Sequence, residues 1–262
     1  MTVNSYLGRI SGAAIIRDTE KDSISKSIGT LHSRVSSWYG AEVSSQFVFG
    51  SYTRGTILPR RIDEKSDIDY MIVFADTSLR PQTYMNKLKA FVEHYYPSSS
   101  IAQSSPTIVL NLNHIRFELA PAINSWLGGL QIPAPASEYT DWISTSPNDF
   151  NSSLTAKNNE NGYKIKPAIR LVKYWNARSG YVFPSYELEK NLVQQWFWNC
   201  TTLSDYFCSM IDGLSLDYFS AQWRQTRLQR AKDIVVQTKY YESQGMPASA
   251  EQEIKKLLPD FV

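Results

Sequence analysis

The chain has 262 residues, a length that suggests one large domain or two small ones. Hydrophobic residues make up 42% of it and charged residues 20%, so the composition is that of a globular protein and excludes a long disordered tail. Lysine and arginine (27) nearly balance aspartate and glutamate (25), which leaves a net charge of +2. This balance argues against stable binding of duplex nucleic acid, which usually requires a strongly basic protein.

The sequence also argues against a membrane or secreted protein. No apolar run approaches the roughly 18–20 residues of a membrane helix, and the first ten residues lack the charged start and apolar core of a signal peptide. Cys200 and Cys208 show neither a CxxC motif nor a neighbouring histidine pair, so we expect no disulfide framework and no zinc site. We therefore expect a cytoplasmic protein.

The first half of the chain mixes predicted helices with predicted strands. Apolar residues recur every three or four positions in some segments and alternate in others. Helices are expected at 19–39 and 81–96, and strands at 45–49, 67–74, 107–112 and 115–120. On the strand at 67–74 the alternation puts Asp67 and Asp69 on one face. It likewise puts Arg116 and Glu118 on one face of the strand at 115–120.

The second half of the chain is predicted to be helical. From Gln131 to Gly162 the composition shifts to Pro, Ser, Asn and Thr, which indicates a loop-rich connector between two lobes. Helices are expected at 164–178, 185–200, 215–241 and 249–258. The sequence therefore predicts an α+β fold in two domains: residues 1–130, with a mixed sheet and helices, and residues 131–262, with the connector and a helical lobe.

Three acidic residues on the predicted strands are candidates for a metal site. Asp67 and Asp69 are two residues apart, which places their Cα atoms about 6–7 Å apart on one face of the strand. Glu118 projects in the same way from another strand. Carboxylate oxygens favour Mg²⁺, and paired metal ions suit phosphoryl transfer. The alternative is that Asp67 and Asp69 line the solvent face of an edge strand.

A Gly50-Ser51 turn follows the strand at 45–49 and adds a second candidate group. Its backbone N–H groups and its hydroxyl are suited to hold phosphate oxygens, although an ordinary tight turn has the same sequence. The order of the motifs favours the phosphate site, because the strand, the Gly-Ser pair and the acidic strands follow one another. The long charged segment between Ser51 and Asp67 is expected to be a flexible loop near the substrate.

The motifs together resemble a known family. The chain resembles the polymerase-β-type nucleotidyltransferases in three motifs, which are Phe49-Gly50-Ser51, Asp67-Ile68-Asp69-Tyr70 and Phe117-Glu118-Leu119. The resemblance is closer to one branch, the bacterial cGAS/DncV-like enzymes. It is carried by residues 49–56, 117–122, 171–176 and 184–189. The resemblance spans nearly the whole chain in order. One departure is Glu118, because the family more often has aspartate there.

The resemblance implies a polymerase-β-like lobe and a helical lobe on either side of a central cleft. It also implies a cyclic oligonucleotide synthase that joins NTPs, ATP among them, into a cyclic di- or trinucleotide second messenger for anti-phage defence of the CBASS type. The metal and catalytic residues implied are Asp67, Asp69 and Glu118, with Mg²⁺ or Mn²⁺. The residues implied to hold the triphosphate are Gly50, Ser51, Lys173 and Ser185. An activator protein or ligand is a candidate partner, and we expect a monomer.

Several of these residues also have simpler interpretations. Lys173 lies on the basic stripe of its helix and would otherwise be a solvated surface lysine. Ser185 follows a proline before a helix and is a good N-cap, a role compatible with phosphate binding. The candidates to stack on a nucleobase are Tyr52, Tyr181 and Tyr186. Trp196 and Trp198 are expected in the helical core.

Two other functions stay open at this point. An enzyme of the same superfamily would transfer a single nucleotide to a protein, a drug or an RNA end, although the near-neutral charge argues against RNA. A catalytically inactive nucleotide-binding homologue is the third hypothesis. The acidic character of all three predicted metal positions argues against it.

Overall fold

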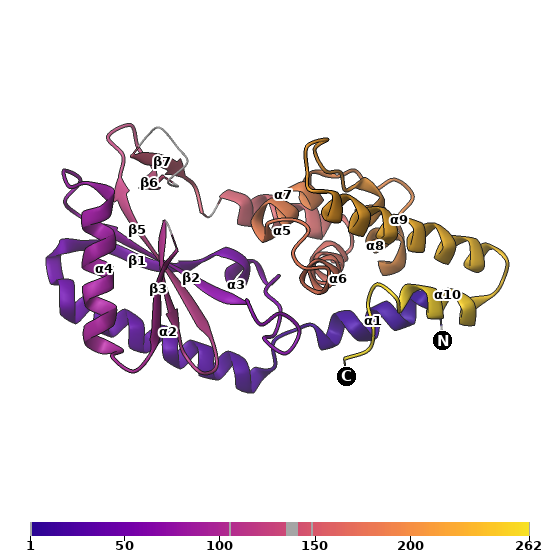
Figure 1. Cartoon of the computed structure of the whole chain (residues 1–262), viewed down its shortest axis with the longest axis horizontal. Coiled ribbons are helices and arrows are strands. Elements are labelled where there is room, and N and C mark those ends of the chain that lie inside the picture. Colours follow the sequence, from indigo (N-terminus) through magenta and orange to yellow (C-terminus); the bar gives the residue numbers. More distant parts are fainter. Residues whose placement is uncertain (1, 105, 135–140, 148, 262) are drawn as a thin grey trace. The chain divides into compact units, whose positions relative to one another are not determined.

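The computed structural model of the chain describes all residues except 1, 105, 135–140, 148 and 262. It consists of two compact units (Figure 1). The sheet unit comprises Arg17–Ile57 and Lys65–Asn151, and the helical unit comprises Met1–Ile16, Leu58–Glu64 and Ser152–Val262. The expected division at residue 130 differs from this one, because the first helix of the chain joins the helical unit and the segment 131–151 stays with the sheet.

The sheet unit is built on a seven-stranded mixed sheet. Its helices are α2 (Asp18–Tyr39), the single 3₁₀ turn Gly40–Glu42, α3 (Gly50–Arg54) and α4 (Pro81–Tyr95). Its strands are β1 (Val43–Phe49), β2 (Asp67–Phe74), β3 (Ser100–Ser104), β4 (Thr107–Asn111), β5 (Arg116–Asn124), β6 (Leu130–Pro133) and β7 (Trp142–Thr145). The order is β1-β2-β5-β4-β3, with β6 paired to β5 and β7. The β2–β5 pair is parallel and the other pairs are antiparallel.

Strand β2 is buried on both faces beyond its first three residues. On one face Phe74 packs against Tyr39 of α2 and Tyr84 of α4, with ring centroids 5.3 and 5.0 Å apart. On the other face Met71 and Val73 form an apolar cluster with residues of β1, β5 and β6. Asp67 and Asp69 precede Met71 and Val73 on that same face. The apolar cluster therefore anchors the strand immediately beside its two carboxylates.

The helical unit surrounds α6. It consists of α1 (Val3–Ala13), most of α5 (Asp149–Glu160), α6 (Ile165–Arg178), α7 (Ser185–Gln194), α8 (Leu203–Gly213), α9 (Gln222–Ser243) and α10 (Pro247–Ile254). Ile165 and every residue from Ala168 to Asn176 are buried, and α6 packs against α1, α7 and α8. The apolar face predicted for this helix is confirmed, with Trp175 in the core, but Arg170 and Lys173 of the expected basic face are buried as well.

Three expectations about residues 131–200 are wrong. The segment expected as a loop-rich connector holds β6, β7 and α5. The helix expected at 185–200 ends at Gln194, where the backbone becomes extended. Trp196 and Trp198 therefore fall on a connection outside the helix, where they are 76% and 82% exposed and stack on each other instead of entering the core.

The segment between Ser51 and Asp67 is also ordered by contacts, and the expectation of a flexible loop is wrong. Residues Leu58–Glu64 belong to the helical unit. There Arg61 donates a hydrogen bond to the carbonyl of Ala13, and the Tyr181 hydroxyl donates to Asp63 at 2.6 Å. Asp63 is buried. No helix among the described residues is long and apolar enough to span a bilayer.

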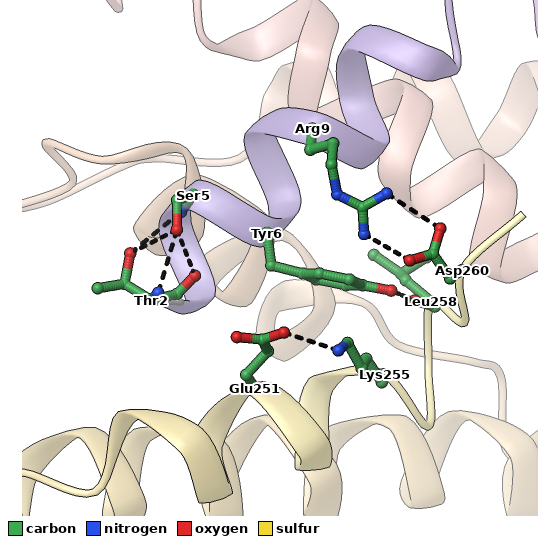
Figure 2. A network of polar contacts seen from close by, with 8 residues as sticks. All are labelled: Thr2, Ser5, Tyr6, Arg9, Glu251, Lys255, Leu258 and Asp260. Carbon is green, nitrogen blue, oxygen red and sulfur yellow. Dashed lines mark hydrogen bonds and ion pairs between the residues drawn. The ribbon is translucent and has the colours of Figure 1, made fainter. Parts of the chain in front are cut away.

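Helix α1 joins the two ends of the chain (Figure 2). The fully buried Tyr6 donates its hydroxyl to the carbonyl of Leu258 at 2.6 Å. Arg9 forms a two-pronged ion pair with Asp260, with N···O distances of 3.0 and 2.6 Å. Burial raises the pKa of Tyr6 to about 12, so it remains a donor at neutral pH. The helix missed in the sequence thus helps to fix the C-terminal segment, together with Tyr174 of α6, whose hydroxyl donates to the carbonyl of Pro259 at 2.8 Å.

Replacing Tyr6 by phenylalanine should lower the free energy of unfolding by about 1–3 kcal/mol, because the buried Leu258 carbonyl loses its donor. Urea unfolding followed by circular dichroism measures this change. The Tyr240→Phe variant, at a residue that is 54% exposed, is the control and should be neutral within error. Equal stabilities of the Tyr6→Phe variant and the wild type would contradict the predicted role of the hydroxyl.

Candidate active site

The three predicted carboxylates lie side by side on the sheet unit. In the parallel β2–β5 pair, Asp69 is the Cα partner of Glu118, and Asp67 is the partner of Arg116. Paired residues of neighbouring strands project to the same face. Asp67 and Glu118 are half-buried, with 22% and 25% of their side chains exposed. The structure therefore brings together Asp67 and Asp69 of one predicted strand and Glu118 of another.

Arg116 bridges two of these carboxylates. One terminal nitrogen of its guanidinium donates to Asp67 Oδ2 at 2.6 Å and to Glu118 Oε1 at 2.9 Å. Charge-assisted hydrogen bonds of this length are strong when they are partly shielded from water. The alternation of β5 had already placed Arg116 on the same face as Glu118, but no pattern in the sequence indicated that it would reach across to Asp67.

The cluster carries more negative charge than Arg116 neutralises. Burial, and next the charge of Asp67, raise the pKa of Glu118 to about 7, although Arg116 acts in the opposite direction. Charged carboxylates this close together repel one another unless a cation lies among them. A cation among them would therefore stabilise their charged forms.

Gly50 allows the backbone to approach Asp69. The β1–β2 register pairs Phe49 with Asp69, so the next residue lies against the Asp69 side chain. Gly50 has φ +74°, and a Cβ atom built on it would lie 1.7 Å from Asp69 Oδ2. No residue with a side chain fits there without moving the carboxylate. Glycine at this position is thus a requirement of the acidic cluster.

Ser51 lies on a short helix and not on the tight turn expected from the sequence. Gly50 and Ser51 are the first two residues of α3, which ends at Arg54. The carbonyl of Ser51 accepts hydrogen bonds from the backbone N–H groups of Thr56 and Ile57, at 3.0 and 3.1 Å. These bonds fix the backbone at Ser51, a residue that is half-buried.

The donors of the cluster fit a hard divalent cation. Carboxylate oxygens are the ligands that Mg²⁺ and Mn²⁺ prefer, and the β2–β5 register supplies three of them. In the described part of the chain, no three acidic, histidine or cysteine side chains form a ready-made metal site. At this cluster the guanidinium of Arg116 already engages oxygens of Asp67 and Glu118. A cation here would share or take over those oxygens.

The predicted lysine and serine belong to the helical unit. Lys173 is not a solvated surface lysine: its Nζ pairs with Glu189 Oε1 at 2.7 Å, and the two side chains are only 6% and 1% exposed. Ser185 is exposed and is the first residue of α7, while the N-cap position belongs to Pro184, so the capping interpretation is wrong. The neighbouring Arg170 is buried as well, which lowers its pKa to about 10.

The three tyrosines considered for base stacking differ in their surroundings. Tyr52 is half-buried on α3. Tyr181 is tied by its hydroxyl to Asp63 in the helical unit. Tyr186 is 50% exposed on the first turn of α7, next to Ser185, so its ring has the most open face of the three.

Comparisons with known proteins identify the family of the chain. The model of the SMODS family, the Second Messenger Oligonucleotide or Dinucleotide Synthetase domain, matches residues 1–158. That range contains Gly50, Ser51 and all three carboxylates. No curated protein sequence matches the chain. The similarity to solved structures, described next, extends over nearly the whole chain.

Three of the similar structures are nucleotidyltransferases of bacteria. The Bradyrhizobium diazoefficiens CD-NTase CdnG in complex with GTP has a TM-score of 0.70 at 11% identity, over 97% of this chain and 98% of that one. The E. coli CdnC with ATP has a TM-score of 0.70 at 12% identity, over 95% and 96%, and CdnC is also similar in its complex with a HORMA protein. The Vibrio cholerae cyclic AMP-GMP synthase DncV has a TM-score of 0.62 at 10% identity, over 81% and 68%. The expected fold class is confirmed.

A Gly50→Ala variant should lose affinity for divalent cations, because its methyl group displaces the Asp69 carboxylate. We expect the affinity for Mn²⁺, measured by titration calorimetry, to fall about tenfold or more, the effect of changing a residue that positions a metal ligand. The matched control is Gly55→Ala, since Gly55 has a similar φ of +70° and a Cβ added to it would meet no atom within 4 Å. Equal Mn²⁺ affinity in the two variants would contradict this role for Gly50.

Replacing Lys173 by methionine should destabilise the helical unit by about 3–5 kcal/mol, because the buried Glu189 carboxylate loses its cation. The double variant Lys173→Met/Glu189→Gln should recover most of this loss, since no unpaired charge is left. Urea unfolding at pH 7 gives both values. Lys190→Met, at an exposed position of α7, is the control. A Lys173→Met protein as stable as the wild type would refute the structural role of the pair.

Proposed function

The chain is a nucleotidyltransferase of the SMODS family, the cGAS/DncV-like enzymes that make cyclic oligonucleotides from NTPs, and we propose that it makes a cyclic di- or trinucleotide. The observation that carries the proposal is the acidic cluster itself. Asp67, Asp69 and Glu118 share one face of the β2–β5 pair, and Gly50 lies against Asp69. We infer a cytoplasmic role in anti-phage defence from the family resemblance.

We assign Mg²⁺, or Mn²⁺ in its place, to the three carboxylates. A bound divalent cation supplies charge neutralisation for the α-phosphate and the leaving pyrophosphate. The carboxylates hold it, and Arg116 sets the orientation of two of them through its hydrogen bonds. Residues that hold ligands in this way contribute mainly by positioning.

The chain's own groups account for the remaining steps. We propose that the backbone at Gly50 and the hydroxyl of Ser51 bind the triphosphate of the donor nucleotide. A ribose hydroxyl of the second nucleotide attacks the α-phosphorus, a new P–O bond forms, and pyrophosphate leaves. Glu118 or Asp69 accepts the hydroxyl proton. A second step of the same kind closes the ring.

Lys173 and Ser185 are proposed to contribute from the helical unit. Their assignment to the triphosphate rests on the resemblance of 171–176 and 184–189 to the family's motifs. The exposed hydroxyl of Ser185 at the first turn of α7 suits this role. Lys173 is engaged by Glu189, so binding phosphate would require it to leave or share that carboxylate. The double variant Lys173→Met/Glu189→Gln, which we expect to keep the fold, tests this role separately.

The substrates and partners follow from the relatives. CdnG was solved with GTP and CdnC with ATP, so we propose NTPs, ATP among them, as substrates of this chain. CdnC was also solved with a HORMA protein, which supports an activating protein partner here. Transfer of a single nucleotide to a protein, a drug or an RNA end is the alternative activity, and an inactive homologue is the remaining alternative.

The synthase activity is tested with the four radiolabelled NTPs and Mg²⁺ or Mn²⁺. We expect a phosphatase-resistant product, and we expect the double variant Asp67→Asn/Asp69→Asn to lose at least about a hundredfold in rate, since it removes two of the three carboxylates proposed to hold the cation. The variant keeps the size of both side chains, and its circular dichroism spectrum controls for folding. Label on an added protein or RNA would favour the alternative activity. Unreacted NTPs with each metal and activator would refute the proposal.

A further inference from the structure

A cavity of about 200 Å³ opens on the helical unit and is surrounded by cationic side chains. Its lining includes Arg178 at the end of α6, Arg227 and Arg230 on α9, and Lys256 just after α10. Ser179 adds a hydroxyl group. None of these residues belongs to the sheet unit that carries the acidic cluster. The cavity is therefore built entirely by the helical unit.

The positive charge of the cavity is not neutralised by the residues around it. Arg227 and Arg230 are three positions apart on one side of α9, and in the described part of the chain neither has an ion pair or a hydrogen bond from its side chain. Of the carboxylates on α10, Glu253 is paired with Lys256 at 2.6 Å, and Glu251 is paired with Lys255 at 2.7 Å.

Two helix ends reduce this positive charge but do not cancel it. Helices α6 and α10 both end beside the cavity, and a helix C-terminus carries about half a negative charge. With Glu253 included, the opposing charge is about two units. Four cationic side chains line the cavity, so an excess of about two positive charges remains. An anion that carries two or more negative charges matches this excess.

The shape and chemistry of the cavity point to phosphate groups. Two unpaired guanidinium groups offer forked donors that match phosphate oxygens, and Ser179 offers a hydroxyl. Trp175 and Leu257 add apolar groups to the lining. At about 30 Å³ for each water molecule, the volume equals that of roughly seven waters, which is room for two linked phosphates.

We propose that this cavity binds a diphosphate group, either as free pyrophosphate or as part of a nucleotide. The wall beyond α10 is held in place by the contacts shown in Figure 2, where Tyr6 binds the carbonyl of Leu258 and Arg9 binds Asp260. Lys256 and Leu257 immediately precede these anchored residues. The ligand therefore joins α6, α9 and the segment after α10, and its binding stabilises the helical unit.

Calorimetric titration with pyrophosphate, ATP and inorganic phosphate, all in EDTA, tests the proposal. Removing divalent cations suppresses binding at the carboxylate cluster. We expect pyrophosphate or ATP to bind the wild-type protein and to raise its melting temperature by a few degrees. Tighter binding of ATP than of pyrophosphate would identify a nucleotide, and equal binding would identify the diphosphate alone as the ligand.

The Arg227→Gln/Arg230→Gln variant should bind pyrophosphate at least about tenfold more weakly, because both free guanidinium groups are lost. Arg80→Gln/Lys232→Gln removes the same net charge from exposed or half-exposed positions outside the cavity and should bind as the wild type does. The single variant Arg227→Gln repeats the test with a smaller change, should the double variant unfold. Absence of binding of all three anions to the wild type, or undiminished binding to the arginine variants, would overturn the proposal.

Discussion

The parallel pairing of β2 with β5 is the constraint on which the candidate site depends. These strands are far apart in sequence, and their register alone places Asp69 opposite Glu118 and Asp67 opposite Arg116. A shift of one residue would turn Glu118 to the other face of the sheet. The apolar cluster of Met71 and Val73 with β5 holds the register, since the same shift would expose it. The packing of apolar side chains thus holds the three carboxylates in place although they repel one another.

Positive charge is placed differently in the two units. In the sheet unit Arg116 is turned inward and satisfies two carboxylates. In the helical unit Lys173 is buried against a single carboxylate, while Arg227 and Arg230 have no acidic partner within the described residues. The nearly neutral net charge of the chain therefore conceals strong local fields. Local fields, rather than the net charge, decide where a phosphate binds.

Two patterns with a short period were interpreted correctly from the sequence. The alternation around Asp67, Asp69 and Glu118 predicted their shared faces, and the 3.6-residue period of α6 predicted a buried Trp175. Features that depend on tertiary contacts were not predicted. Helix α1 was missed although Thr2 caps it and Val3, Tyr6, Leu7 and Ile10 recur at helical spacing. What fixes it is the burial of Tyr6 against the distant C-terminal segment.

The side chains of the candidate site show the same limit. The sequence pattern places Lys173 on the basic stripe of α6. Its burial depends on Glu189, which comes from another helix. Similarly, the sequence around Phe49 does not show that residue 50 must be a glycine. That requirement comes from the β1–β2 register, which brings Asp69 against Gly50. The sequence suggested a turn at Gly50, but glycine is required there because a side chain would collide with the carboxylate of Asp69 on the next strand. This requirement becomes visible only when the strands are paired.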